Sequence, residues 1–476
     1  MALAAMVRAF LPRTQPWIAR HSYRWELVQA MTMPVALSLV EGSVITILAK
    51  KAFGVGPIAF AALMAAPMFA NLTSFGWTRL ARGRPKAPFL AGLCLACLAC
   101  VAAIGALPTA KPGGTLLVLL VIATRCLMAG IITVRSVVWR HNYPRRFRAT
   151  VTGRLWLITT LLLTLAPLGA YFLLDRAENA FRIAYPAAAA IGVVGALAMA
   201  RVRVRGEKAL LKFERETSRR PERRGERAPL YEYDPRSPRL AKPTFWRVLK
   251  DDRFFRRYML WQFVVGVCFM SSETLAVLVI ANATDGLMNE YFLSIVLTTA
   301  IPMSMSVATL PMWARILDRI SIVRFRVRQG AFWVTMVVAY FVGATLALRG
   351  ELMAGLLVMA LGRLMAGLAR AGGMLAWQLG HNDFASRHMV SVYMGIHVTL
   401  TGVRGATAPF AAVLLYTGWQ SGALRWLGIE RVPAFEGLGP AVFAILLVGI
   451  AVALAGFAQL DRAMVRAGRN KLDAGD

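Results

Sequence analysis

The chain has 476 residues, of which 58% are hydrophobic and 17% are charged, and its mean hydropathy is +0.56. Because soluble domains average about 25% charged residues, this composition excludes an ordinary soluble protein and indicates a membrane protein. The net charge of +31 would suggest nucleic acid binding in a soluble chain. Here the basic residues alternate with apolar stretches, so we expect no nucleic acid partner. Five cysteines are too few for a disulfide framework, and no grouping of residues predicts a metal site or a cofactor.

The N-terminal segment, residues 1–26, is basic and carries no acidic residue before Glu26. We interpret it as an amphipathic helix on the cytoplasmic face of the membrane. An organellar transit peptide, which has a similar composition, is the alternative.

Twelve apolar stretches of about 20 residues, the length that crosses a bilayer, follow in two groups of six. They cover approximately residues 30–50, 56–78, 87–107, 114–138, 149–174 and 183–203, and then 257–281, 289–313, 329–348, 352–376, 390–416 and 438–460. This pattern predicts an all-α membrane protein with 12 transmembrane helices. They would form two pseudo-symmetric six-helix bundles, residues 27–203 and 256–462.

A charged, proline-punctuated segment, residues 204–255, separates the two groups and is predicted to be a cytoplasmic linker with a helix at each end. Residues 463–476 form a short tail. Lys and Arg are retained on the cytoplasmic side of membranes. With both termini inside, about 41 of the 55 Lys and Arg residues lie on that side, where anionic lipid headgroups would contact them. We therefore expect an integral multi-pass protein of a cytoplasmic (inner) membrane, of bacterial type.

The two halves repeat short patterns at an offset of about 240 residues. "RHNYPRRFRATVTG", which begins at Arg140, is echoed by "GHNDFASRHMVSVYMG", and "LMAG" at Leu127 recurs at Leu364. The echo indicates a duplicated bundle. His141 and His381 fall at the cytoplasmic ends of predicted spans, so we expect them to have structural rather than catalytic roles.

Two loops in corresponding positions of the two halves carry related patterns. The loop after the second stretch reads "GWTRLARGRPK", and its counterpart reads "ARILDRISIVR". In these loops Gly76, Gly83, Arg84, Lys86, Asp318 and Arg319 match the family pattern, whereas Leu80 stands where an aspartate belongs. With its six-plus-six arrangement, the chain resembles the major facilitator superfamily of secondary transporters. The resemblance implies that these loops are cytoplasmic latches; the alternative is that their basic residues only set topology.

Charged residues deep in a span cost roughly 2.5 to 3.5 kcal/mol each, so they persist when they are paired or when they line a polar cavity. The deep ones are Glu41, Arg125, Glu273, Arg363 and Arg404. In the family that the chain resembles, the first, fourth, seventh and tenth spans line the central pathway. We therefore expect two mirrored pairs, Glu41 with Arg125 and Glu273 with Arg363, on a substrate and proton pathway. The alternative is that the pairs are static clamps between helices.

Pro167 and Pro409 interrupt the fifth and eleventh stretches and are predicted to let these helices flex. The function that the resemblance implies is secondary active transport of a small solute by alternating access, by a monomer. Proton coupling and export of an anionic or amphiphilic metabolite or drug are the finer expectations. An uncoupled facilitator or exchanger on the same fold is the alternative. A membrane-embedded transferase is disfavoured because the candidate residues come in mirrored pairs, so we expect no enzymatic activity.

Overall fold

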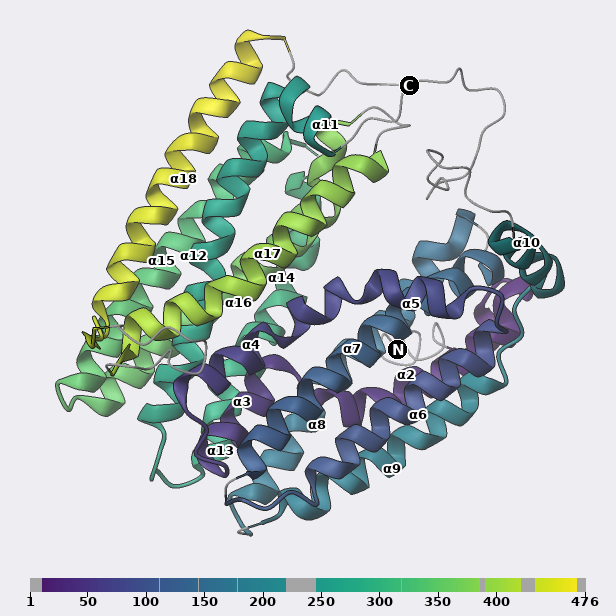
Figure 1. The fold of residues 1–476 in the computed structure, drawn as a ribbon. Helices are drawn as coiled ribbons and strands as arrows, with labels where there is room; N and C mark the ends of the chain where they lie inside the picture. Colours follow the sequence, from purple (N-terminus) through teal and green to yellow (C-terminus); the bar gives the residue numbers. More distant parts are fainter. Residues whose placement is uncertain are drawn as a thin grey trace.

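The computed structural model describes most of the chain. The described ranges are 11–110, 112–143, 145–177, 179–219, 245–317, 319–385, 390–420 and 433–468. Within them the chain is almost entirely helical, and the helices form two bundles (Figure 1).

Within the described residues the N-terminal bundle contains eight helical segments. These are α2 (Arg20–Ser38), α3 (Gly42–Lys51), α4 (Pro57–Leu72), α5 (Ser74–Ala81), α6 (Lys86–Ile104), α7 (Gly113–Asn142), α8 (Arg145–Leu174) and α9 (Phe181–Ala200). The first expected span is α2 followed by α3, with an interruption just before Gly42. The second is α4 followed by α5, with an interruption at Thr73.

The expected amphipathic N-terminal segment, residues 1–26, is described only from residue 11, because residues 1–10 lie outside the described ranges. Between residues 11 and 19 the chain forms only two 3-10 turns, Pro12–Thr14 and Trp17–Ala19. Pro12 and Pro16 lack the backbone N–H that a continuous helix needs. Helix α2 begins at Arg20 and continues into the first span.

Two linker helices and the C-terminal bundle follow. The linker contains α10 (Glu207–Arg219) and α11 (Phe245–Asp251), and the expected linker residues between them lie outside the described ranges. The bundle contains α12 (Arg253–Ala283), α13 (Glu290–Ile295), the π-helical turn η3 (Val296–Ala300), α14 (Ile301–Leu317), α15 (Ile322–Leu348), α16 (Leu352–Leu379), the 3-10 turn η4 (Gly380–Asp383), α17 (Val390–Thr417) and α18 (Ala441–Arg466). A two-residue antiparallel hairpin, β1 (Gly418–Trp419) with β2 (Phe435–Glu436), precedes α18.

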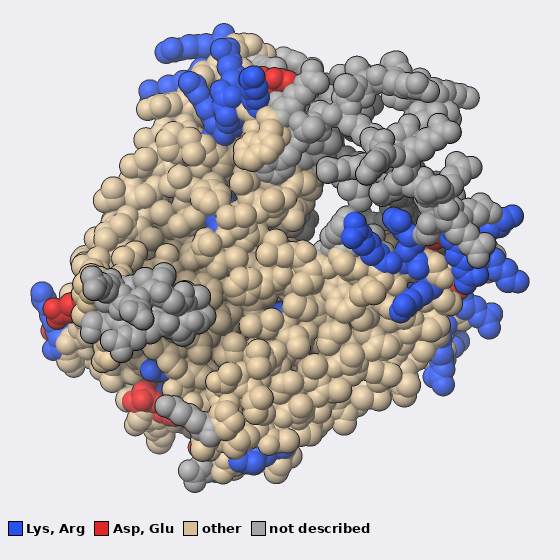
Figure 2. Space-filling model, viewed as in Figure 1, with Lys and Arg blue, Asp and Glu red and all other residues tan. Residues whose placement is uncertain are grey.

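Eleven helical segments among the described residues are long and apolar enough to cross a membrane. The first part of the second expected span, α4, is also apolar but has only 16 residues. It ends early because the Thr73 hydroxyl donates to the Ala70 carbonyl at 2.7 Å and also accepts the Trp77 indole N–H at 3.1 Å. The fold class expected from the sequence is thus confirmed, with one span shorter than predicted. Figure 2 shows uncharged side chains over the middle of the molecule and Lys and Arg gathered toward its ends.

The bundles contact each other through only some of their helices. Helix α4 packs on α17, α3 packs on α12 and α13, and α8 packs on α13 and η3. A Cβ on Gly405 would lie 2.2 Å from Cγ of Met68, so the glycine permits the close approach of α17 to α4. In Figure 1 the bundles diverge toward the end at which α10 and α11 lie. We call this end the linker side, and the opposite end, which holds β1 and β2, the hairpin side.

Candidate functional site

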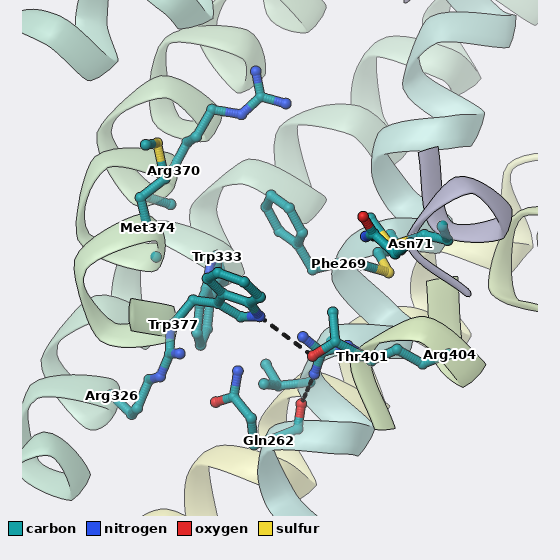
Figure 3. Close-up of a pocket in the computed structure, with 16 residues that line it drawn as sticks. Asn71, Gln262, Phe269, Arg326, Trp333, Arg370, Met374, Trp377, Thr401 and Arg404 are labelled. Atoms are coloured by element: carbon teal, nitrogen blue, oxygen red, sulfur yellow. Dashed lines mark hydrogen bonds between the residues drawn. The ribbon is translucent and has the colours of Figure 1, made fainter. Parts of the chain in front are cut away.

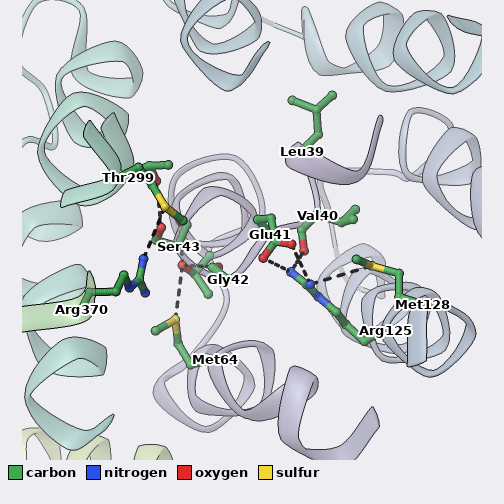
Figure 4. A network of polar contacts seen from close by, with 12 residues as sticks. Leu39, Val40, Glu41, Gly42, Ser43, Met64, Arg125, Met128, Thr299 and Arg370 are labelled. Atoms are coloured by element: carbon green, nitrogen blue, oxygen red, sulfur yellow. Dashed lines mark hydrogen bonds and ion pairs between the residues drawn. The ribbon is translucent and has the colours of Figure 1, made fainter. Parts of the chain in front are cut away.

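The first ion pair lies at the interruption between α2 and α3. Glu41 precedes the first residue of α3, and both of its carboxylate oxygens accept from the Arg125 guanidinium of α7, at 3.1 and 3.0 Å. Arg125 also donates to the Val40 carbonyl at 2.5 Å, one of the carbonyls that the interrupted helix leaves without an intrahelical partner. Arg125 is therefore held by a carboxylate and by the backbone together (Figure 4).

The second ion pair has the same chemistry in the other bundle. Arg363 of α16 donates to Glu273 of α12 at 2.7 Å, and the Tyr340 hydroxyl of α15 lies 3.0 Å from the same carboxylate oxygen. Arg363 also donates to the carbonyls of Leu297 and Thr298 in the π-helical turn η3, at 3.2 and 2.7 Å. The structure thus brings together both Glu and Arg pairs that the sequence suggested, each with backbone carbonyls of an irregular helix. Their role in transport stays a prediction.

One hydrogen bond connects the surroundings of the two pairs. The hydroxyls of Ser43 in α3 and Thr299 in η3 lie 2.9 Å apart, across the boundary between the bundles (Figure 4). Ser43 is two residues from Glu41, and Thr299 follows a carbonyl that Arg363 binds. The two pairs are therefore linked through short backbone segments rather than by direct contact.

A cavity of about 450 Å³ lies beside the second pair, between α12, α15, α16 and α17, with Met68 and Asn71 of α4 at its edge. Three arginines are among the residues that line it, Arg326, Arg370 and Arg404, and the Arg370 side chain extends away from the other two (Figure 3). Its size falls in the range of small-molecule sites in proteins, about 300 to 1,000 Å³.

Arg404 was expected from the sequence to be deep, and it is buried in this cavity, donating to the Gln262 carbonyl. Arg326 was missed because it lies just before the apolar core of the ninth stretch, although its side chain is only 2% exposed. Arg370 was not among the deep charged residues that the sequence suggested. It lies close enough to both Glu41 and Glu273 to interact with them electrostatically.

A third buried carboxylate, Glu26 of α2, was assigned to the N-terminal surface segment and not to the bundle. It accepts hydrogen bonds from the Tyr143 hydroxyl at 2.7 Å and from the Trp139 indole N–H. Nearby, Arg135 donates to Gln29 at 3.1 Å. Glu26 could not be recognised as buried from the sequence, because residues 1–26 were interpreted as a surface segment that ends before the first span.

The loop that matches the family's latch pattern binds the linker helix α10. Lys86 forms an ion pair with Glu214 at 2.7 Å, and the same carboxylate oxygen accepts from the Gly83 backbone N–H at 2.7 Å. Glu207 accepts from the Lys86 backbone N–H at 2.8 Å. Gly76 and Arg84 are exposed. The latch role of this loop stays a prediction.

In the corresponding loop of the second half, Asp318 lies outside the described residues and Arg319 is exposed. Just beyond it, Arg324 forms an ion pair with Asp461 of α18 at 3.2 Å. Pro167 and Pro409 are both buried and lie inside α8 and α17, which continue through them. Their predicted role in helix flexing stays a prediction.

The hairpin side carries polar contacts between the bundles that the sequence did not suggest. Lys51 of α3 lies 3.3 Å from carboxylate oxygens of both Asp285 and Glu290. Asp175, which follows α8, accepts from the backbone N–H groups of Tyr291 and Phe292 in the first turn of α13, at 2.8 and 2.7 Å. A carboxylate is favourable at a helix N-terminus. These contacts hold the hairpin side closed.

The repeated His-Asn patterns have structural contacts where the structure describes them. His141 Nδ1 bonds the Val137 carbonyl at 2.9 Å, one helical turn away. Asn142 donates to the Ser22 hydroxyl at 2.8 Å and accepts from the Arg205 backbone N–H at 3.0 Å. Asn142 therefore joins α7 to α2 and to the chain after α9.

Several solved structures resemble this arrangement of helices. No curated protein matches the chain. Among solved structures, the POT family transporter PepTSo is similar over 94% of this chain and 99% of its own, with a TM-score of 0.63 and 11% identity. A bacterial homologue of the human lysosomal transporter Spinster, inward-facing and unoccupied, matches over 95% and 99% with a TM-score of 0.57 and 15% identity. A D-xylose–proton symporter matches over 91% and 96%, with a TM-score of 0.58 and 11% identity.

These identities show a shared fold and nothing finer. The family profile described as Major Facilitator Superfamily matches residues 27–409, which cover the N-terminal bundle and the C-terminal bundle as far as α17 and contain both Glu and Arg pairs. The resemblance noted in the loops and the paired spans is thereby confirmed, and the chain belongs to the Major Facilitator Superfamily.

Proposed function

We propose that this protein is a secondary active transporter that moves a small solute by alternating access, coupled to protons. Membership of the superfamily supports transport rather than catalysis, and the mirrored pairs support the coupling. The observation that carries the proposal is that each bundle holds one Glu and Arg pair, with a buried arginine, at an irregular helix. The two irregular segments meet at the Ser43 and Thr299 hydrogen bond.

The pairs provide a way to couple a proton to a conformation. Protonation of Glu41 or Glu273 would remove the negative charge that holds the partner arginine. That arginine would then be free to rearrange its carbonyl contacts at the helix interruption or at η3. A ligand or proton that binds one conformation better than another shifts the population toward it.

The net charge of the central region favours an anionic solute. Five buried or partly buried arginines, Arg125, Arg326, Arg363, Arg370 and Arg404, outnumber the two carboxylates of Glu41 and Glu273 in this region. The apolar and aromatic cavity wall suits an amphiphilic molecule. Export of such a metabolite or drug is the direction we propose, by analogy with the family.

The setting that we propose is a bacterial cytoplasmic membrane. The linker side would face the cytoplasm, with both termini inside and its basic residues in contact with anionic headgroups. The bundles diverge toward that side (Figure 1), so the conformation would be inward-open. We propose the domain division at residues 27–203 and 256–462, with a monomer as the transporting unit.

The test is a solute-uptake screen in proteoliposomes, with and without an imposed pH gradient, of the parent and of Glu41→Gln and Glu273→Gln. We expect both variants to lose the gradient-driven part of uptake. Glu351→Gln, which replaces an exposed glutamate at the start of α16, is the matched control and should behave as the parent. Gradient-independent uptake by the parent would favour the facilitator or exchanger. If both variants responded to the gradient as the parent does, the pairs would be static clamps.

A further inference from the structure

We propose that the cavity lined by Arg326, Arg370 and Arg404 is an anion site that takes the carboxylate, sulfonate or phosphate group of an amphiphilic organic anion. The inference rests on the proposed function, because it assigns the solute class and the residues that recognise it. Among the described residues the site lies almost wholly in the C-terminal bundle, and the N-terminal bundle contributes to it through α4.

Arg326 and Arg404 have no carboxylate partner in the cavity among the described residues, whereas Arg370 interacts electrostatically with Glu41 and Glu273. None of the lining residues that the structure describes is acidic. Glu273 is already bound by Arg363 and by Tyr340, and Glu41 by Arg125. A buried cation without a counter-charge costs several kcal/mol, so an anion that enters this cavity would relieve an existing cost.

The hydrogen-bonding capacity of the arginines is also unfilled. Arg326 donates to the neutral amide oxygen of Gln329 at 2.8 Å, and its Nε has no hydrogen-bond partner among the described residues. Arg404 donates to a backbone carbonyl, and its Nε likewise has none in that part of the chain. Both side chains are at most 5% exposed. Buried donors of this kind normally have partners, and the planar guanidinium suits the oxygens of a carboxylate or phosphate.

A neighbouring glycine brings Arg404 to this position. A Cβ built on Gly266 of α12 would lie 2.1 Å from an Nη atom of Arg404. Only a residue without a side chain lets this guanidinium lie against α12 with its charge toward the cavity (Figure 3). The glycine therefore acts as a positioning residue for the proposed site.

The rest of the cavity is suited to the body of an organic anion. Phe269, Trp333, Trp377 and Met374 form apolar and aromatic walls around the arginines (Figure 3). The Arg326 guanidinium lies 5.7 Å from the Trp333 ring centre, so a flat aromatic ligand could pack beside a cation that is already oriented. A volume of about 450 Å³ is far larger than an inorganic ion requires.

The experiment compares two ligands of the same shape and different charge. Purified protein in an uncharged maltoside detergent is titrated calorimetrically with 2-naphthoate and with the neutral 2-naphthalenemethanol. We expect naphthoate to bind the parent at least about tenfold more tightly than the alcohol, and Arg404→Gln and Arg326→Gln to weaken naphthoate at least about tenfold. Arg349→Gln, at the exposed end of α15, is the charge-matched control and should leave binding unchanged.

A variant at the neighbouring glycine keeps the positive charge of Arg404 but should change its position. Gly266→Ala should displace the Arg404 guanidinium and weaken naphthoate without changing the net charge. Gly395→Ala in α17, where an added Cβ meets no atom within 4 Å, should not. Elution as a single monodisperse species separates weakened binding from misfolding. Equal affinity for the acid and the alcohol, or naphthoate binding that both arginine variants and Gly266→Ala leave unchanged, would overturn the proposal.

An experiment in nanodiscs distinguishes a lipid headgroup from a free organic anion as the natural ligand. If anionic lipid suppresses naphthoate binding to the parent relative to discs of zwitterionic lipid alone, and Arg404→Gln abolishes the difference, the site takes an anionic headgroup. If lipid charge has no effect, the site takes a free organic anion. The proposed function and the proposed anion site can fail independently of each other. Binding without any transport would leave the site intact, whereas gradient-driven uptake of other solutes by a parent that does not bind naphthoate would remove the site alone.

Discussion

Ser43 and Thr299 belong to opposite bundles, and their hydroxyls lie 2.9 Å apart. Each is within two residues of a group in a Glu and Arg pair: Glu41 on one side, and on the other the Thr298 carbonyl that Arg363 binds. The bond therefore joins the helix interruption of one bundle to the π-helical turn of the other. A change at either pair that moves its backbone segment would strain or break this bond.

Replacing Ser43 should favour separation of the bundles on the hairpin side. A hydrogen bond of this kind contributes about 1 kcal/mol, so Ser43→Ala should shift the ratio of closed to open hairpin sides about fivefold toward open. Spin labels at Arg176 and Met288, in a background without the native cysteines, would report the change as a longer distance population. Ser136→Ala, in an exposed part of α7, is the control. An unchanged distance distribution in Ser43→Ala would show that the bond does not contribute to closure.

The ion pair between Lys51 and Glu290 should make a larger contribution than the neighbouring pair with Asp285. The Lys51 side chain is 1% exposed and that of Glu290 is 22% exposed, whereas that of Asp285 is 70% exposed. Exposed pairs contribute about 0 to 1 kcal/mol. We expect Glu290→Gln to open the hairpin side in the same spin-label measurement and Asp285→Asn to leave it nearly unchanged. Equal effects of the two substitutions would contradict the ranking by burial.

The sequence predicted the bundles and both ion pairs because each rests on a local or repeated pattern. A carboxylate such as Glu273 in an apolar stretch needs a partner, and the duplication indicated that Arg363 corresponds to Arg125. What it could not predict depends on how distant segments meet. Lys51 and Asp175 were missed because neither apolar periodicity nor repeat spacing records which helix ends of the two bundles face each other.

Arg326 and the N-terminal segment show a different limit. Arg326 lies in "IVRFRVRQG", where three arginines alternate with apolar residues, and counting charges placed it with the flanking cytoplasmic residues. Arg326 lies three residues before Gln329, so the two side chains lie on the same side of the helix. Because Gln329 is buried, that side faces inward. At the N-terminus, composition suggested a helix, whereas residues 11–19, which include Pro12 and Pro16, form two 3-10 turns.

Loss of Glu214 should release the linker helix from the N-terminal bundle. Its carboxylate binds both the Lys86 ammonium and the Gly83 backbone N–H, in a loop that has Leu80 where the family pattern has an aspartate. The linker thus brings a carboxylate to a loop that lacks its own. Because the Lys86 side chain is 2% exposed, Glu214→Gln would leave a buried ammonium without its counter-charge.

We expect faster hydrogen exchange across α10 in Glu214→Gln, measured by mass spectrometry, together with a lower unfolding temperature. The removal of one partner of a buried pair costs about 3 to 5 kcal/mol, with this pair toward the lower end because Glu214 is 18% exposed. Arg215→Gln is the control, since its contacts to the Gly83 carbonyl are exposed and 3.4 Å long. Unaltered exchange in α10 would show that the helix is held by other contacts.

His381 should make the protein less stable as the pH falls. Its side chain, in the turn after α16, is 4% exposed, and burial lowers the pKa of His381 below the value of about 6.5 that it has in the unfolded chain. Near neutral pH both states hold the imidazole neutral. Once the pH falls through 6.5, the unfolded chain binds a proton that the folded protein does not, and folding stability declines until the lower folded pKa is reached.

Substitution of His381 by a residue that cannot be protonated should remove this part of the pH dependence. We expect the unfolding temperature in detergent to fall less between pH 7.5 and 5 in His381→Gln than in the parent. His381→Phe should show the same reduced slope even if its unfolding temperature at pH 7.5 differs, because packing changes shift the whole curve whereas proton linkage changes its slope. A slope equal to that of the parent in both variants would mean that the acid sensitivity arises from other groups.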